Sequence, residues 1–126
     1  MLEQNNGKKP KKYAGILAHP TSFPSPYGIG DLGPGAYQFI DFLAASGLNL
    51  WQVLPLGHAG FGDSPYQPFS AFAGQPLIID IDYLRKKKLL LDEDFSAMPD
   101  WDPEKIDYGT LIEFKTGLLK QAYERF

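Results

Sequence analysis

The chain has 126 residues, and its 12 Lys and Arg against 15 Asp and Glu give a net charge of −3. This balance argues against nucleic-acid binding, which needs a clustered basic face to neutralise phosphates. The chain has no cysteine, which excludes disulfide scaffolds, thiol catalysis and cysteine-ligated zinc. It also lacks the roughly 18 to 20 consecutive apolar residues that a membrane helix needs. We therefore expect a soluble globular protein that does not span a membrane.

The first twelve residues are polar and basic. Lys8, Lys9, Lys11 and Lys12 lie close together and repel one another, and the stretch has little to bury. We expect residues 1–12 to form a disordered basic tail. The stretch lacks the apolar block of a secretory signal, and with the missing cysteines this indicates a cytoplasmic protein.

The next part of the chain predicts a strand, a helix and a second strand. Short apolar runs at 13–18 and 50–56 are typical of buried strands. Pro34 and Gly47 flank residues 36–46 as helices are commonly flanked. The inner face of this helix is predicted to hold Tyr37, Ile40, Leu43 and Ala44. Strand, helix and strand make a βαβ unit, so the two strands should be parallel.

A long irregular segment follows each of these strands. Residues 19–35 hold four prolines and four glycines, and residues 57–76 are rich in small residues, prolines and aromatics. We expect both to be ordered loops that lack regular structure. In a parallel sheet or barrel, such loops emerge at the carboxyl ends of the strands, where ligands bind. The functional site is therefore expected there.

The second half of the chain predicts one more strand and two more helices. Residues 77–82 are typical of a strand and residues 82–90 of a short helix, and an acidic connection spans 91–105. Asp107 is placed to cap a last helix over 110–126. The predicted inner stripe of this helix is Leu111, Phe114, Leu118 and Ala122. Gly117 weakens the helix by about 1 kcal/mol relative to alanine.

Familiar catalytic patterns are absent. His19 and His58 have no metal-ligand spacing and are interpreted as hydrogen-bonding loop anchors. No serine lies in a G-x-S-x-G elbow, and GIGDLG does not match a phosphate-binding glycine loop. These residues imply no cofactor and no metal. Asp31, Asp63 and Asp80 are the carboxylates near the ligand face, and no pattern selects a pair for glycosyl transfer.

Aromatic residues are the most informative feature of the two loops. An oligosaccharide stacks its apolar face on aromatic rings, while its hydroxyls bond carboxylates, amides and hydroxyls. Both kinds of group occur here: the aromatic residues are Tyr27, Phe61, Tyr66, Phe69 and Phe72, and the polar ones are Asp63, Ser64 and Gln67. From composition alone, packing of the same aromatics onto the fold explains the pattern equally well.

Two long motifs carry a family resemblance. HPTSFPSPYGIGDLG at 19–33, and LWQVLPLG followed by GDSPYQPFSAFAG within 50–74, resemble the amino-terminal part of the 4-α-glucanotransferases, or amylomaltases, of glycoside hydrolase family 77. The resemblance continues less specifically to residue 126. It implies transfer of α-1,4-glucan segments between maltodextrins by a retaining double displacement, with an Asp carrying the donor glycosyl and a Glu as acid/base. It implies an α/β fold, with residues 13–126 as the first βα units of a (β/α)₈ barrel.

The resemblance also implies roles for individual residues. Tyr66 matches the family tyrosine that stacks on the sugar next to the cleaved bond, and Ser64 and Asp63 flank it. Phe61 stands where several relatives have a tyrosine associated with glucan binding away from the active centre, so a second glucan site would lose a hydroxyl here. The family's catalytic carboxylates lie in later barrel strands. This chain should therefore contain none of the catalytic residues.

Chain length shapes the functional hypothesis. An eight-unit barrel needs about 200 to 250 residues, so one expected partner is the missing carboxy-terminal half of the barrel. The resemblance implies α-1,4-glucans as the other. A barrel fragment leaves strand edges and helix faces uncovered. The hypothesis is an amino-terminal segment of a 4-α-glucanotransferase that is inactive alone. The alternatives are a stand-alone glucan-binding module and a nonfunctional remnant of a truncated gene.

Overall fold

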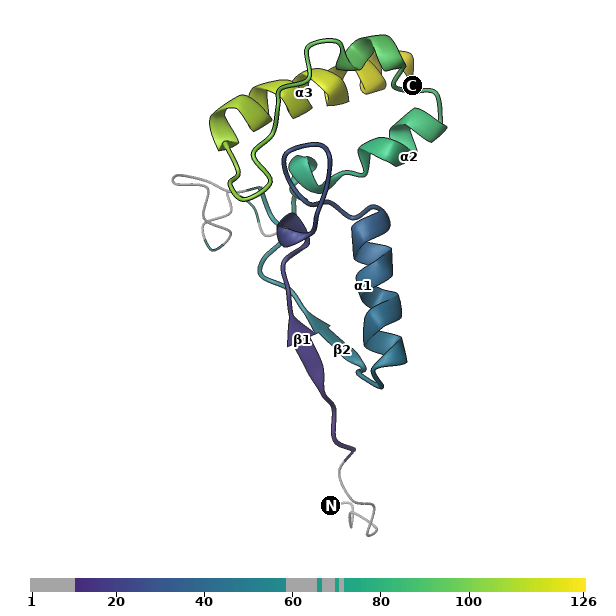
Figure 1. Cartoon of the computed structure of the whole chain (residues 1–126), viewed down its shortest axis with the longest axis vertical. Coiled ribbons are helices and arrows are strands. Elements are labelled where there is room, and N and C mark those ends of the chain that lie inside the picture. The colour runs from purple at the N-terminus through teal and green to yellow at the C-terminus, as the bar shows by residue number, and fades with distance from the viewer. Residues whose placement is uncertain (1–10, 59–65, 67–69, 71) are drawn as a thin grey trace, which may run out of the picture.

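The computed structural model describes residues 11–58, 66, 70 and 72–126. Most of the predicted tail, residues 1–10, lies outside this part. The elements in chain order are β1 (Gly15–Leu17), the 3-10 helix η1 (Pro20–Ser22), α1 (Pro34–Ala45), β2 (Leu50–Gln52), the 3-10 helix η3 (Pro76–Ile78), α2 (Ile81–Lys86), the 3-10 helix η4 (Asp92–Phe95) and α3 (Tyr108–Arg125). Figure 1 shows two layers, a βαβ layer of β1, α1 and β2 and a helical layer of α2, η4 and α3. None of the described helices has the length and apolar character needed to cross a membrane.

The predicted βαβ unit is confirmed. β1 and β2 pair in parallel, with Gly15 opposite Leu50 and Leu17 opposite Gln52. Both strands are shorter than the apolar runs at 13–18 and 50–56, and they are half exposed rather than buried as predicted. Parallel strands become fully buried only when neighbouring strands and layers on both faces cover them. In the described part of the chain, the sheet consists of these two strands.

The predicted ends of α1 are confirmed, but its predicted inner face is largely wrong. Pro34 is the first helical residue, and Gly47 follows the helix with a φ of +70°. Leu43 is buried, whereas Tyr37 and Ile40 are 66% and 46% exposed, and Ala44 is exposed as well. The spacing of the apolar residues therefore predicted the position of the helix, but not which of its apolar side chains pack against the sheet.

An aromatic cluster holds α1 against the sheet and the loop after β1. The Phe39 ring centroid lies 5.1 Å from that of Phe23 and 5.4 Å from that of Trp51. Trp51 also donates its indole N–H to the Ala18 carbonyl over 2.7 Å. Phe39 thus packs where we predicted Tyr37 and Ile40 to pack, because the rings of Phe23 and Trp51 lie on the side of the helix that Phe39 occupies.

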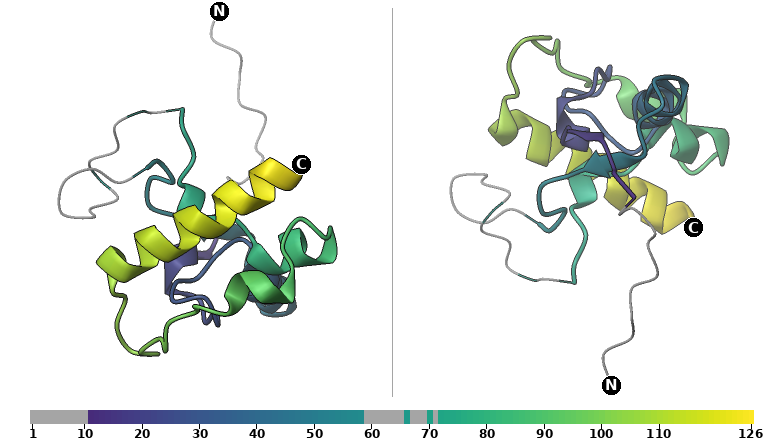
Figure 2. Two further views of the ribbon diagram at one scale, coloured as in Figure 1. Left: turned by 90° about the horizontal axis from the view of Figure 1, so that it is seen from above. Right: turned by 90° about the horizontal axis from the view of Figure 1, so that it is seen from below.

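The main core lies in the helical layer. Seen from above in Figure 2, α3 lies across the molecule over the loop that follows β1. The predicted cap is confirmed, because Asp107 accepts from the Thr110 backbone N–H at 3.3 Å. The predicted stripe is confirmed too, with Phe114 partly buried. The buried side chains of this core are Tyr27, Ile29, Leu77, Ile81, Leu90, Leu111, Leu118 and Ala122.

The predicted strand at 77–82 is wrong. The chain instead forms η3 and then α2, which ends at Lys86, before the predicted end at residue 90. Side-chain caps favour the helical turns: Gln75 accepts from the Leu77 N–H at 3.5 Å and Asp80 from the Tyr83 N–H at 3.0 Å. The 19–35 loop and the 91–105 connection likewise contain short 3-10 helices, η1 and η4.

α1 and α2 end in the same kind of turn, with different residues in its left-handed position. After α1, Gly47 has a φ of +70°, and Leu48 N–H donates to the Leu43 carbonyl at 2.9 Å. After α2, Lys88 has a φ of +60°, and Leu89 N–H donates to the Leu84 carbonyl at 3.0 Å. A residue with a Cβ loses about 1 to 2 kcal/mol in this conformation, whereas glycine does not.

We predict that Lys88→Gly stabilises the chain by about 1 kcal/mol and that Gly47→Ala destabilises it by about 1 kcal/mol. Apart from its two chain neighbours, no atom of the described residues lies within 4 Å of the Cβ position at Gly47, so Gly47→Ala tests backbone strain. Urea unfolding followed by far-ultraviolet circular dichroism measures both changes. Lys87→Gly is the matched control, because Lys87 has a φ of −80° and gains no relief from glycine. Equal destabilisation by Lys88→Gly and Lys87→Gly would contradict the prediction.

Candidate functional site

The two long loops leave the sheet at the same end. β1 and β2 are parallel, so His19 after β1 and Val53 after β2 both continue from the carboxyl ends of the strands (Figure 1). Of the predicted substrate-binding residues, Phe61, Asp63 and Ser64 lie outside the described residues. Tyr66 is described, and its side chain is 68% exposed.

The base of the 57–76 loop is closed by backbone contacts. Gly57 and Gly74 form an antiparallel bridge. Gln75 N–H donates to the Leu56 carbonyl over 2.8 Å. We call Leu56, Gly57, Gly74 and Gln75 the loop neck. The neck leads directly into η3, so the position of η3 sets where the loop returns to the fold.

The structure separates the predicted aromatic residues into two groups. Tyr66 and Phe72 are exposed, Phe72 completely, whereas Tyr27 is buried in the core. Phe61 and Phe69 lie outside the described residues. Exposed aromatic side chains between the ends of one loop are typical of a surface that contacts a ligand. Packing therefore explains Tyr27, while Tyr66 and Phe72 remain candidates for stacking on a sugar.

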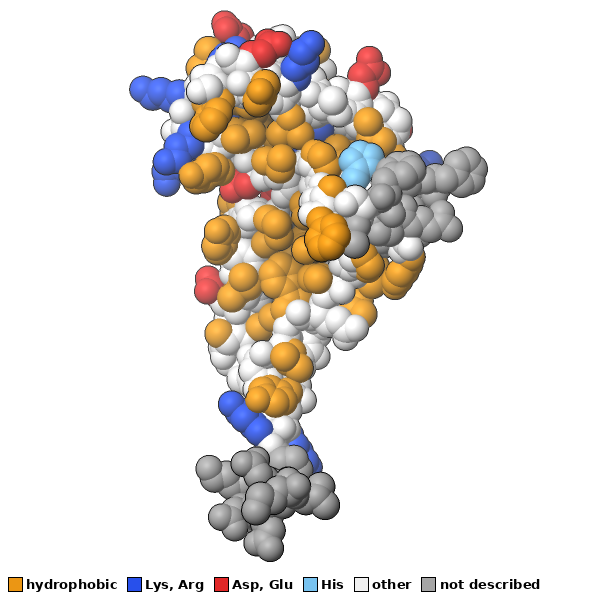
Figure 3. Space-filling view, turned by 180° about the vertical axis from the view of Figure 1, so that it is seen from behind, with side chains coloured by type: hydrophobic (Ala, Val, Ile, Leu, Met, Phe, Trp, Pro, Cys, Tyr) orange, Lys and Arg blue, Asp and Glu red, His pale blue; other side chains and the backbone are white. Residues whose placement is uncertain are grey.

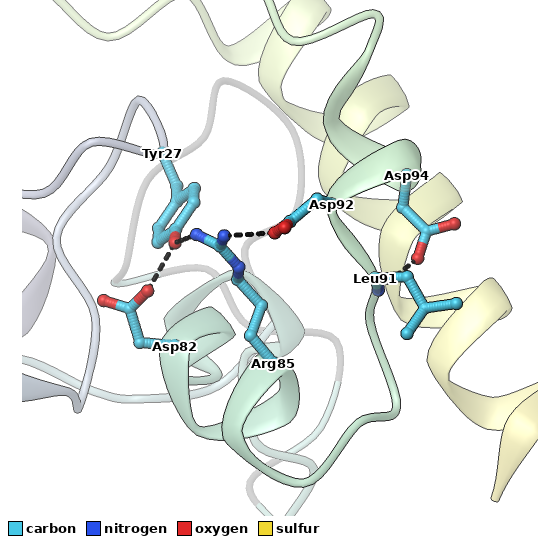
Figure 4. A network of polar contacts seen from close by, with 6 residues as sticks. All are labelled: Tyr27, Asp82, Arg85, Leu91, Asp92 and Asp94. Atoms are coloured by element: carbon cyan, nitrogen blue, oxygen red, sulfur yellow. Dashed lines mark hydrogen bonds and ion pairs between the residues drawn. The ribbon is translucent and has the colours of Figure 1, made fainter.

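A polar network pins the 19–35 loop to the helical layer (Figure 4). Tyr27 donates its hydroxyl to the Asp82 carboxylate over 2.5 Å, and Arg85 donates to the Tyr27 oxygen over 3.4 Å and to Asp92 over 2.6 Å. Burial raises the pKa of Tyr27, and its bond to Asp82 raises it further. The hydroxyl therefore stays protonated, and Tyr27 serves as a structural anchor.

His19 is the loop anchor that the sequence predicted. Its Nδ1 accepts from the Thr21 N–H at 3.4 Å and lies 2.8 Å from the Thr21 hydroxyl oxygen. This contact caps η1. The other ring nitrogen, Nε2, is buried without a hydrogen-bond partner in the described part of the chain. Within the same residues, no three His, Asp or Glu side chains are grouped as a metal site requires.

Two of the candidate carboxylates meet beneath the loops, and the third, Asp63, lies outside the described residues. Gly33 N–H donates to the buried Asp31 carboxylate over 3.0 Å. A Cβ at Gly33 would lie 2.7 Å from Asp31 Oδ1 and 2.9 Å from Asp80 Cγ. Both carboxylates therefore lie against the backbone of Gly33, and only glycine leaves them room.

A lysine that the sequence reasoning missed completes this buried group. Lys115 has no exposed surface and donates its ammonium group to the Leu77 carbonyl over 2.6 Å. It lies four residues after Leu111 and three before Leu118, in the apolar stripe of α3. A lysine at such a stripe position is the sequence signal that could have found it, since buried lysines need partners. We call Asp31, Asp80 and Lys115 the buried charge cluster, in which Asp31 and Lys115 are buried and Asp80 is half-buried.

Burial is the main cause of the pKa shifts in this cluster. It raises the pKa of Asp31, against the opposing effects of the Gly33 N–H and Lys115. It lowers the pKa of Lys115 from 10.5 to about 8, while Asp31 and Asp80 act in the opposite direction. Perturbed pKa values can mark active sites. Lys115 is completely buried, so its lowered pKa does not mark it as a group that contacts a substrate.

Comparison with known proteins identifies the family. The family described as 4-alpha-glucanotransferase, glycoside hydrolase family 77, matches residues 18–126. The chain belongs to the 4-alpha-glucanotransferase family. This match confirms the resemblance carried by the two loop motifs.

The relatives of this chain are much longer than the chain itself. It is 47% identical over 116 residues to the 4-alpha-glucanotransferase of Synechocystis sp., covering 92% of this chain and 23% of the relative. It is 48% identical over 112 residues to that of Thermus thermophilus, covering 89% and 22%. The structure resembles an amylomaltase from Streptococcus agalactiae in complex with acarbose, with a TM-score of 0.85, 42% identity, and coverage of 92% and 24%. The chain thus spans less than a quarter of these relatives.

We predict that the stability of the wild-type chain rises relative to Lys115→Met as the pH increases from 7.0 to 9.5. The folded state lowers the pKa of Lys115, so above pH 8 the unfolded state binds more protons and the folded state gains stability. The expected gain is roughly 2 kcal/mol, and it should be complete near the ordinary lysine pKa. Urea midpoints at the two pH values measure it, and parallel curves for the two proteins would contradict it.

Proposed function

We propose that this chain acts as the amino-terminal segment of a 4-α-glucanotransferase and supplies part of its donor-sugar site. Membership of the family and the exposed Tyr66 side chain support this proposal. The observation that carries it is the loop neck, which presents Tyr66 and Phe72 to solvent at the carboxyl end of the parallel strands. α-1,4-Glucans are the proposed ligand, and the solved relative in complex with acarbose supports this class.

In this proposal, the chain binds and orients the sugar while other residues break the bond. Tyr66 stacks on the apolar face of the sugar next to the cleaved bond, and Asp63 and Ser64 contribute polar contacts to its hydroxyls. The 19–35 loop, anchored by Tyr27 and His19, forms the rigid neighbour of this surface. The carboxylates of a retaining double displacement, the nucleophilic Asp and the acid/base Glu, are proposed to lie outside this chain.

The apolar surface of the βαβ layer supports the second part of the proposal, in which further barrel strands cover this chain. Leu17 and Leu50 on the two strands are half exposed, as are Tyr37 and Ile40 on α1. Figure 3 shows one face of the molecule with many apolar side chains at its surface. A sheet of two short strands also leaves backbone groups for further pairing. We therefore propose residues 13–126 as the first βα units of a (β/α)₈ barrel. A cytoplasmic location is a separate part of the proposal.

A complementation experiment tests this function. The 126-residue chain is mixed with a polypeptide that comprises the part of the Thermus thermophilus relative beyond the matched region. We predict disproportionation of maltotriose by the mixture and none by either piece alone. Tyr66→Ala should lower kcat/KM roughly tenfold, the effect of losing about 1.4 kcal/mol of binding. Tyr123→Ala is the control, because Tyr123 is a similarly exposed tyrosine on α3.

The outcomes separate this function from its alternatives. Activity of the 126-residue chain alone would contradict the proposal that the catalytic carboxylates lie outside it. Binding of maltoheptaose by the chain alone, without any activity in the mixture, favours a stand-alone glucan-binding module. A chain that neither binds glucan nor complements its partner fits a nonfunctional remnant and rejects the proposed function.

A further inference from the structure

Lys115 is an unusual residue to find at the centre of this core. It is the largest of the described side chains that are completely buried, and it sits in the apolar stripe of α3. Burying a charged group is unfavourable unless partners compensate, and even paired buried charges add little to stability. An apolar residue of similar length would fill the same space without this cost. The position therefore calls for a role other than filling the core.

The single hydrogen bond that the structure assigns to Lys115 points to such a role. Its ammonium donates over 2.6 Å to the carbonyl of Leu77, the middle residue of η3. Two residues before Leu77, Gln75 pairs with Leu56 in the loop neck. One residue after it, the Ile78 carbonyl accepts from Leu32 N–H over 3.0 Å. Lys115 thus contacts η3 between the neck and the 19–35 loop.

The two carboxylates of the buried charge cluster act on the ammonium group through space, and neither is ion-paired with it among the described residues. Asp31 belongs to the 19–35 loop, and Asp80 caps α2 by accepting from the Tyr83 N–H. Both attract the Lys115 charge and partly offset its burial. Asp31 lies on the 19–35 loop, whereas Leu77 and Asp80 lie three residues apart on the stretch that joins η3 to α2. The surroundings of the ammonium group therefore depend on how these two segments are placed against α3.

We propose that Lys115 is a positioning residue for the loop that carries Tyr66: by holding the Leu77 carbonyl it fixes η3, and with it the neck from which that loop extends. This inference rests on the proposed function for the role of the loop, while the effect on the neck stands by itself. Lys115 touches no substrate. It acts through Leu77 and the neck, from the opposite side of the core.

Residue-resolved hydrogen exchange of the 126-residue chain tests the effect on the neck. The variants are Lys115→Met, which removes the donor, and Asp31→Asn/Lys115→Met, which removes it without leaving Asp31 as an unpaired buried charge. The control is Lys120→Met, an exposed lysine on the same helix. We expect the amides of Gln75, Ile79 and Leu32 to exchange at least about tenfold faster in both variants. The Leu48 amide at the end of α1 should keep its wild-type rate.

The exchange pattern separates positioning from general support. Equal acceleration at Leu48 and at the neck would show global loosening and overturn the proposal. Wild-type exchange at the neck in the double variant would overturn it as well. Unfolding of both variants would also overturn it, because a support confined to η3 and the neck leaves the remaining core intact.

Titration with maltoheptaose, followed by the backbone amide NMR signals of residue 66 and of the loop neck, connects the neck to ligand binding. We expect Lys115→Met or the double variant to raise Kd at least about threefold, whereas Lys120→Met leaves it unchanged. Tyr66→Ala reports on the proposed function separately. If Tyr66→Ala weakens binding while the neck variants do not, the positioning role fails and the function stands. If the wild type binds no maltoheptaose, the complementation experiment decides the proposed function, and the exchange experiment still decides whether Lys115 holds the neck.

Discussion

The bond from the Lys115 ammonium to the Leu77 carbonyl ties α3 to η3 and, through η3, to the loop neck. α3 follows η3 by about thirty residues of chain, and this bond brings the two together in the interior. At the C-terminal end of the helix, Arg125 forms a two-pronged pair with Asp94 of η4, at 2.5 and 2.9 Å. α3 is therefore fastened near its middle and at its C-terminal end.

The Tyr27 network and the buried charge cluster support the loops in different ways. The Tyr27 network lies partly at the surface, where solvent screens its ion pair, so its value is geometric: it orients the 19–35 loop against α2. In the buried charge cluster Asp31 and Lys115 are buried, so burial shifts the pKa of each, and the backbone N–H of Gly33 partly offsets the shift at Asp31. A site built on loops needs such supports, because loops bury too few apolar side chains to hold their own shape.

The sequence predicted the features of this fold that local signals determine. Pro34, Gly47 and Asp107 mark helix ends because their effects act within one turn, and the stripe of α3 follows from its period alone. The prediction failed where the outcome depends on what lies opposite. Tyr37 and Ile40 have the right spacing for an inner face, but the rings of Phe23 and Trp51 lie beside Phe39 instead.

The same division applies to the candidate site. The aromatic composition of the loops identified Tyr66, but only the fold shows that Tyr27 is a core residue and Tyr66 an exposed one. The run at 77–82 alternates like a strand, but its contacts are those of helical turns. Gln75, which precedes the run, and Asp80, a polar residue within it, cap these turns. Lys115, on α3, donates to the Leu77 carbonyl. Asp31 was a candidate carboxylate from the sequence, but its electrostatic interaction with Lys115 exists only when the chain between them is folded.

Each layer of the molecule contains one tryptophan, and only Trp51 belongs to the aromatic cluster around Phe39. Trp51 lies in the βαβ layer with its N–H bonded to the Ala18 carbonyl, and Trp101 packs on Phe114 and the core of the helical layer with its N–H buried and unbonded in the described structure. The chain has two tryptophans in all. Tryptophan fluorescence during unfolding therefore reports whether the two layers unfold in one step or one after the other.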